Sequence, residues 1–242
     1  MRLCARLVAK GFTQIFGLDY NEIFSPVARF ESLQLLLVLA MLEDWEIHQM
    51  DVKSAFLNGV LEEEIYMEQP QGFIDPEHPY KVCLLKKAIY SLKQASCTWN
   101  LQFHGVLLGI GFMRTRLDAG VYHCQDDGGT TIIILYVDDI TILSDSIDSI
   151  SQVKAALTSC YEMTDLREIS SYLGVNIKCD RSKKQMEIDQ SQYILQIINR
   201  FGLSDANSMH TPLPLGVDVH LCKYDGEASP ADAQDEWQDM VN

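Results

Sequence analysis

Two adjacent carboxylates, Asp138 and Asp139, lie between two apolar runs and are the residues of this sequence best placed to do chemistry. The runs cover residues 131–135 and 140–143 and are rich in β-branched side chains. Such runs on either side of a short polar turn predict a β-hairpin with both aspartates at its tip. Like charges at the end of buried strands are costly unless a cation neutralises them, which points to a divalent metal. A solvated turn is the alternative, because short motifs often occur by chance.

A third carboxylate, Asp51, follows another segment that reads as a strand. Residues 45–50 alternate between apolar and polar side chains, so Asp51 is expected at a strand end as well. Three aspartates at neighbouring strand ends could hold two Mg²⁺ ions, which in nucleotidyl transfer bind the attacking 3′-oxygen and the leaving pyrophosphate. This chemistry requires no protein nucleophile.

Length and composition are those of a globular protein. The 242 residues, 47% of them hydrophobic, can bury a substantial core as one compound domain or two small ones. The seven cysteines are odd in number and lack C-x-x-C spacing, which favours reduced thiols over disulfides or a zinc site. The N-terminus is charged too early for a signal peptide, and the longest apolar run, residues 35–42, is short for a membrane span. We therefore expect a soluble intracellular protein.

The net charge of −15 is unusual for a protein that binds nucleic acid, but the charge is unevenly distributed. From residue 204 onward eight acidic residues stand against Lys223 alone, whereas no acidic residue occurs between Glu77 and Asp118. That interval, which we call the basic window, contains Lys81, Lys86, Lys87, Lys93, Arg114 and Arg116. It is a candidate phosphate-facing surface, and a merely solvated face is the alternative.

The order of expected elements indicates an α+β fold. Helices are predicted over residues 31–44, 98–108, 149–161 and 190–201, the second of them capped by Ser96 or Thr98. A strand is predicted over residues 65–68, and hairpins are predicted to turn at residues 126–129 and 181–184. After Pro214 the sequence is polar, acidic and aperiodic, so we read residues 215–242 as a linker.

Six sequence blocks in a fixed order resemble the reverse transcriptase domain of Ty1/copia-type LTR retrotransposon polyproteins. The resemblance extends from about Arg6 to Pro214. The blocks are ARLVAKGF at residues 5–12, FSPV at 24–27, QMDVKSAFLNG at 49–59, EEIYMEQP at 63–70, LKQA at 92–95 and YVDD at 136–139. Together they are far more specific than any single motif.

The resemblance implies a right-hand polymerase palm, an antiparallel sheet backed by helices, with partial fingers and a connection or thumb element. Residues 1–214 would form an N-terminally truncated reverse transcriptase, and residues 215–242 an acidic linker toward a missing RNase H domain. The implied partners are an RNA/DNA template-primer duplex, dNTPs, and the integrase and RNase H domains of the same polyprotein. The implied location is the cytoplasm, in a virus-like particle, or the nucleus, with no membrane partner.

The resemblance also assigns roles near the three aspartates. Asp51, Asp138 and Asp139 match the catalytic metal triad, with Asp51 and Asp138 as direct ligands, Asp139 as a supporting carboxylate, and the backbone of Val52 as a further ligand. The cofactor would be two Mg²⁺ ions, for which Mn²⁺ can substitute.

Further matches concern the incoming nucleotide. Phe56 matches the aromatic residue that excludes a 2′-OH, although core packing is an equally good interpretation. Arg6 matches an arginine that pairs with the triphosphate, with a solvated surface role as the alternative. Gln94 matches a glutamine near the sugar and the templating base. The triphosphate would be held by the main-chain N–H groups of Lys53, Ser54 and Ala55.

Several departures from the family pattern favour a second hypothesis, a catalytically silent remnant that keeps the fold and nucleic-acid binding. Ser91 and Arg167 stand where glycine is usual, and a Cβ there would strain a positive φ. Ser96 and Cys97 replace the usual Pro-Arg ahead of Trp99, and Cys4 replaces a lysine. The sequence thus reads as a fragment or decaying copy with its triad intact.

Overall fold

The protein folds as two compact units in a computed structural model that describes residues 6–126 and 128–206. The first unit comprises Met1–Ser170 with Ile177–Glu187, and the second comprises Ser171–Asn176 with Ile188–Asn242. Cys4 and the acidic segment of residues 215–242 lie outside the described residues. The two units are treated separately below.

The first unit is built on a six-stranded antiparallel sheet with the strand order β4-β5-β6-β7-β1-β8. The predicted hairpin between β5 and β6 is confirmed, since Asp126 pairs with Gly129 across the turn. The strands are β1 (Glu46–Val52), β4 (Met113–Arg114), β5 (Val121–Asp126), β6 (Gly129–Tyr136), β7 (Asp139–Ser144) and β8 (Met163–Glu168).

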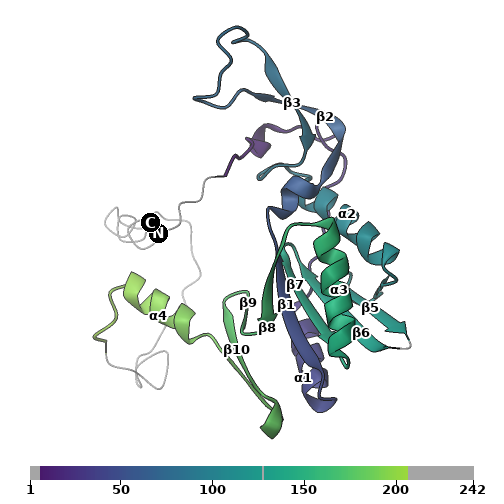
Figure 1. Cartoon of the computed structure of the whole chain (residues 1–242). Coiled ribbons are helices and arrows are strands. Elements are labelled where there is room, and N and C mark those ends of the chain that lie inside the picture. The colour runs from purple at the N-terminus through teal and green to yellow at the C-terminus, as the bar shows by residue number, and fades with distance from the viewer. Residues whose placement is uncertain (1–5, 127, 207–242) are drawn as a thin grey trace, which may run out of the picture. The chain divides into compact units, whose positions relative to one another are not determined.

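Helices cover this sheet, because its strands are apolar on both faces (Figure 1). α2 (Ala95–Gly109) and α3 (Ile147–Cys160) share one core with the side chains of one face, among them Ile133 and Ile142. Ile134 and Leu143 alternate to the opposite face and are also buried. α1 (Phe30–Leu42) lies behind the sheet in this view and α3 lies in front of it.

The predicted helices exist, but the predicted cap of the second one is wrong. α2 begins at Ala95, three residues before the expected start, and Gln94 is its N-cap residue without a side-chain cap bond. Ser96 and Thr98 therefore lie inside the helix, where the Thr98 hydroxyl donates to the Gln94 carbonyl at 2.9 Å. Threonine can satisfy its hydroxyl within a helix in this way, so a Ser/Thr residue alone does not fix a helix start.

A two-stranded sheet of β2 (Val60–Glu68) and β3 (Val82–Lys87) extends from the region of α2 (Figure 1). Between this hairpin and the central sheet lies the short helix η2 (Ala55–Asn58). A second short helix, η1 (Gly11–Thr13), follows a bridge between Val8 and Tyr90. A Cβ on Gly11 would lie 1.8 Å from the Ser91 carbonyl oxygen, so this close approach requires glycine.

The hairpin predicted to turn at residues 181–184 is confirmed. β10 (Val175–Asp180) leads through the short helix η3 (Arg181–Lys183) to β11 (Gln185–Asp189). Within the first unit, Arg181 donates to Asp44 Oδ1 at 3.0 Å and pairs with Glu46, which ties η3 to the turn between α1 and β1. Strand β8 was not expected, because its central residues are exposed and do not alternate in polarity.

In the second unit, β9 (Ser171–Tyr172) pairs with the first two residues of β10. The Asn176 side-chain amide donates to Asp189 Oδ1 at 3.0 Å, and α4 (Ser191–Arg200) begins two residues after Asp189. α4 matches the predicted amphipathic helix, yet none of its side chains is buried. Across the described part of the chain, no helix is both long and apolar enough to cross a membrane.

Candidate active site at the β6–β7 turn

The two adjacent aspartates lie at a two-residue turn between β6 and β7. Tyr136 pairs with Asp139 as the last pair of the ladder, so Val137 and Asp138 form the loop. Val137 has φ of +56°, a left-handed conformation that a β-branched residue rarely adopts. Two-residue hairpin loops need positive φ, and glycine or asparagine usually supplies it. The turn is therefore held in a strained conformation by its surroundings.

Two hydrogen bonds from outside the hairpin hold this turn. The N–H of Val52 in β1 donates to the Asp138 carbonyl at 2.9 Å. The indole Nε1–H of Trp99 in α2 donates to the Val137 carbonyl at 2.7 Å. Each loop carbonyl thus accepts one bond from a different element of the core.

Asp51 and Asp139 are directly opposite each other across the β1–β7 pair. Opposed residues of an antiparallel pair project on the same face of the sheet with Cβ atoms close together. Asp138 follows from the adjoining turn. The structure therefore brings together the three aspartates that the sequence analysis singled out, although Asp51 is far from the other two along the sequence.

The electrostatics show that the carboxylates influence one another. Burial, followed by the negative charge of Asp138, raises the pKa of Asp51, while Lys53 opposes this rise. Burial also raises the pKa of Asp139, and the charges of Asp138 and Asp51 add to the effect. A weak hydrogen bond from Gln49 Nε2 to Asp139 Oδ1, 3.5 Å long, acts in the opposite direction.

The donor atoms around this turn suit a hard divalent cation. Carboxylate oxygens are the ligands that Mg²⁺ prefers, and a cation would offset the repulsion that raises the two pKa values. Among residues 6–126 and 128–206, no three or more His, Cys, Asp or Glu side chains are already arranged to hold a metal ion. The three carboxylates would therefore have to move closer together to bind an ion. Because they repel one another, they would do so only with a cation between them.

The segment after Asp51 was matched to a triphosphate-binding stretch. Ser54 adopts φ of +53° and leads into η2, which begins at Ala55. The N–H of Lys53 donates to the Glu162 carbonyl at 3.0 Å, and its ammonium group pairs with the Glu162 carboxylate at 2.6 Å. Lys53 is thus engaged with the residue ahead of β8, and its role toward phosphate stays a prediction, as do those of Ser54 and Ala55.

Phe56 lies at a junction between two hydrophobic clusters and is half-buried. Its ring meets the Tyr90 ring edge-on, with centroids 5.1 Å apart. The Arg6 guanidinium lies over the Tyr90 ring, 5.2 Å from its centroid. The two residues matched to nucleotide contacts, Arg6 and Phe56, are therefore linked through Tyr90.

Gln94 is turned inward. Its side chain is only 2% exposed, and its amide accepts from Gln14 Nε2 at 3.1 Å and donates to the Asp19 carbonyl at 2.9 Å. In this arrangement the amide connects the N-terminal segment to the start of α2. Contact with a nucleotide stays a prediction for Gln94 and would require these bonds to rearrange.

The departures from the family pattern have clear structural consequences. Ser91 and Arg167 have φ of +72° and +65°, the conformation that glycine adopts without penalty. Cys97 is buried, and burial followed by the negative charges of Glu22 and Glu63 raises the pKa of its thiol. The position where the family usually has arginine thus faces two carboxylates without a cation of its own.

The basic window divides into two parts. Lys81, Lys86, Lys87 and Lys93 are exposed on β3 and the loops beside it. Arg114 instead donates to the Tyr122 hydroxyl at 2.8 Å and to Asn100 Oδ1 at 3.2 Å. The Arg114 guanidinium is therefore engaged inside the protein, whereas the four lysines and the exposed Arg116 are the part of the window available to phosphate.

Three residues of the site were not assigned a role from the sequence. They are Trp99, which holds the turn, Gln49, which contacts Asp139, and Tyr90, which joins Arg6 to Phe56. Gln49 could have been found from strand alternation, because it is two residues before Asp51 and shares its face. The Trp99 contact joins residues 38 positions apart and has no local signal.

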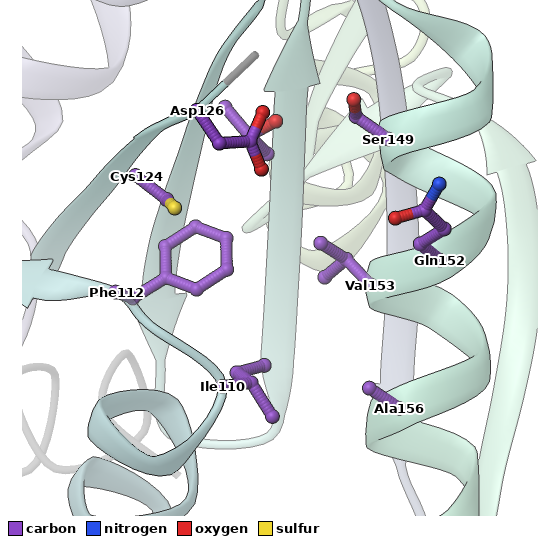
Figure 2. A pocket seen from close by; sticks show the side chains of 9 residues that line it. Ile110, Phe112, Cys124, Asp126, Ser149, Gln152, Val153 and Ala156 are labelled. Carbon is purple, nitrogen blue, oxygen red and sulfur yellow. The ribbon is translucent and has the colours of Figure 1, made fainter. Parts of the chain in front are cut away.

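A small cavity of about 200 Å³ lies at the opposite end of β6 from the turn, between the β5–β6 hairpin and α3 (Figure 2). Phe112, Ile110 and Val153 form its apolar part, and Asp126, Ser149 and Gln152 lie at its polar end. It contains none of the residues assigned above to the candidate site.

The first unit is thus an antiparallel sheet flanked by helices, with carboxylates at the end of adjacent strands, as expected for an α+β fold of this kind. Comparison with known proteins identifies the family: the chain belongs to the reverse transcriptases (RNA-dependent DNA polymerases), whose family model matches residues 1–214.

Its relatives are transposon proteins. Over 214 residues the chain is 39% identical to the retrovirus-related Pol polyprotein from transposon TNT 1-94 of Nicotiana tabacum, covering 88% of this chain and 16% of that polyprotein. It is 37% identical over 212 residues to the Pol polyprotein from transposon RE1 of Arabidopsis thaliana, covering 88% of this chain and 14% of the other. A putative transposon Ty5-1 protein of Saccharomyces cerevisiae is 34% identical over 68% of this chain and 53% of its own length. The chain therefore spans a small part of the plant polyproteins that it matches.

Proposed function

We propose that this chain is an RNA-directed DNA polymerase domain that transfers nucleotides from dNTPs to a primer 3′-OH. The observation that carries the proposal is the pairing of Asp51 with Asp139 across two central strands, beside a turn that presents Asp138. In this proposal the six-stranded sheet with its helices is the palm, and the β2–β3 hairpin with the N-terminal segment belongs to the fingers. The hairpin and helix after β8 would form a connection or thumb element.

The chemistry follows from this arrangement of carboxylates. Asp51 and Asp138 would hold two Mg²⁺ ions, with Asp139 and the backbone of Val52 in support. When bound, the ions would lower the pKa of the primer hydroxyl and stabilise charge on the leaving pyrophosphate. The residues of the chain would supply position: the Val52–Asp138 and Trp99–Val137 bonds fix the turn, and Gln49 orients Asp139.

Substrate selection is assigned to the residues around Tyr90. Arg6 would pair with the triphosphate. Phe56 would contact the sugar at its 2′ position and so would clash with the 2′-hydroxyl of a ribonucleotide. The exposed lysines Lys86, Lys87 and Lys93 would lie along the template-primer duplex, where phosphate contacts give affinity without sequence preference.

The alternative function is a silent remnant that binds nucleic acid without extending it. Ser91 and Arg167 at positive φ favour it, because each adds strain to the framework of the site. We prefer the polymerase proposal because the strained turn keeps both of its supporting hydrogen bonds, from Val52 and from Trp99.

Primer extension on poly(rA)·oligo(dT) with purified protein tests the proposal. We expect extension that requires Mg²⁺ or Mn²⁺ and is abolished by Asp138→Asn or Asp51→Asn. Asp148→Asn, at an exposed position in the first turn of α3, is the matched control and should extend normally. Equal extension by the parent and Asp138→Asn would show that the aspartate assignment is wrong. Binding without extension by the parent would support the remnant.

A further inference from the structure

The turn that carries Asp138 has a conformation that its own sequence disfavours. Val137 is β-branched and has φ of +56°, where an L-residue meets a steric penalty of about 1–2 kcal/mol. The strain would be relieved if Val137 moved to a negative φ, which would reorient its carbonyl group and the peptide that joins it to Asp138. Some contact must therefore select the observed orientation.

The orientation of this peptide determines where Asp138 lies. The carbonyl of Val137 and the N–H of Asp138 belong to one planar peptide unit, so a rotation of one displaces the other. The hydrogen bond from Val52 N–H reaches the next carbonyl, that of Asp138, and leaves the Val137 carbonyl free to turn. The bond of 2.7 Å from Trp99 Nε1 acts on the Val137 carbonyl itself.

Trp99 can act as a rigid donor. Its side chain is 1% exposed and is enclosed by Phe103 and Tyr161, whose ring centroids lie 5.2 and 5.1 Å from its own. An indole held between two aromatic rings cannot swing to another acceptor. An indole N–H that lost its acceptor in so buried a place would also be costly, so the bond and the turn conformation stabilise each other.

We propose that Trp99 is a positioning residue for the metal-binding turn: its indole N–H fixes the Val137–Asp138 peptide and thereby the Asp138 carboxylate. This inference rests on the proposed function of the three aspartates. Trp99 touches neither substrate nor metal in this scheme and acts only through the backbone of the turn.

The test uses Trp99→Phe, which keeps an aromatic ring in the core and removes the N–H. Two readouts are measured on the whole chain: Mn²⁺ binding without nucleotide, followed by the loss of the free-ion EPR signal, and the Mn²⁺ dependence of primer extension. Removing the bond should weaken Mn²⁺ binding and lower kcat, each on the order of 10-fold, the scale of one buried hydrogen bond. Leu157→Ala is the matched control, because it loosens the same core and is not one of the rings that enclose Trp99.

A second pair of variants separates positioning from packing. Glycine favours positive φ, so in a Val137→Gly background the turn no longer depends on the indole to stay in place. Adding Trp99→Phe to Val137→Gly should therefore weaken Mn²⁺ binding by less than about 3-fold. In the parent, which has Val137, the same substitution should weaken binding by more. An equal loss in both backgrounds would overturn the proposal.

The remaining outcomes distinguish this inference from the proposed function. If Trp99→Phe binds Mn²⁺ as the parent does, or if Leu157→Ala loses as much as Trp99→Phe, Trp99 has no positioning role and the aspartate assignment stands. If the parent binds no more Mn²⁺ than Asp138→Asn, the assignment of the metal site fails, and the role of Trp99 fails with it.

Discussion

Phe56 is half-buried between two hydrophobic clusters, and in the proposed function it would also meet the sugar of the incoming nucleotide. Its ring packs edge-on against the Tyr90 ring. A residue that is part of the core on one side can act as a steric barrier on the other, because packing prevents it from moving aside. Core packing and sugar selection are therefore compatible for this residue.

Truncation of Phe56 should admit ribonucleotides. Phe56→Ala removes a clash without adding a contact, so we expect the ratio of rNTP to dNTP incorporation to rise by on the order of 10-fold. The loss of a half-buried ring should also cost about 2 kcal/mol of the free energy of unfolding, somewhat less than for a fully buried phenylalanine. Incorporation ratios from single-nucleotide extension and urea unfolding measure the two effects. Leu57→Ala is the neighbouring control, and an unchanged ratio in a folded, active Phe56→Ala protein would leave Phe56 as a core residue only.

At the scale of secondary-structure elements, Ser91 and Arg167 stand where the family usually has glycine, and both have the positive φ that glycine favours. Ser91→Gly and Arg167→Gly should each stabilise the protein by about 1 kcal/mol, because relief of the left-handed penalty exceeds the added entropy of the unfolded chain. Urea unfolding of each variant provides the measurement. Ser170→Gly, an exposed position without positive φ, should instead be neutral or destabilising. Destabilisation by all three glycines would mean that the strain is absent in solution.

Asp118 links α1 to the loop before β5. Its buried carboxylate accepts from the Arg29 N–H, the Ser32 hydroxyl and the Gly120 N–H, at 2.9, 2.5 and 2.9 Å. Burial alone would raise the pKa of Asp118, but these hydrogen bonds hold it below the ordinary value. The charged form is therefore the one that stabilises the fold.

Asp118→Asn should lower the free energy of unfolding by about 2 kcal/mol at neutral pH, because a charged acceptor of three bonds is lost. Since the native pKa is depressed, the contribution of Asp118 is complete above the unfolded value, ~4, and disappears as the pH falls through the native value. The difference between parent and variant should thus be constant above pH ~5 and shrink below pH ~4. Urea unfolding across this range measures it. A difference that is independent of pH would show that the carboxylate charge is not responsible.

The sequence predicted those elements whose determinants are local. The β6–β7 hairpin follows from two β-branched runs, and α1 follows from an apolar stretch of helical length. Strand β8 could not be predicted, because it is held by pairing with β1 more than 100 residues away and its own side chains are largely exposed. For the same reason the sequence pointed to the three aspartates but not to the contact of Trp99 with their turn. That contact is created only by the packing of α2 against the turn.

At the scale of the whole molecule, charge is the property that governs nucleic-acid binding, which both functional hypotheses require. The protein has a formal charge of −15, yet Lys86, Lys87 and Lys93 are exposed. Local charge rather than net charge governs phosphate contacts, because interactions beyond about 10 Å are screened at 0.1 M salt. An acidic protein can therefore still bind a duplex through one basic surface.

If these lysines contact the template-primer duplex, the binding constant should fall as salt rises, because each neutralised phosphate releases counterion and contributes a slope of about −0.9. Changing all three lysines to glutamine should flatten the plot of log K against log salt by about 2 to 3 units. Fluorescence anisotropy with a labelled duplex at several salt concentrations measures the slope for the parent and the triple variant.

The matched control is Lys183→Gln with Lys184→Gln, which removes two lysines from the η3 turn, where Lys183 pairs with Asp180 and Lys184 donates to the Leu42 carbonyl. Lysines engaged within the protein contact no phosphate, so this double variant should leave the slope almost unchanged. A flattened slope in the triple variant, with normal extension at low salt, would place the duplex along β3 and the loop before α2. If both variants flatten the slope equally, binding is a diffuse effect of net charge, and the lysines of the basic window do not form the duplex-binding surface.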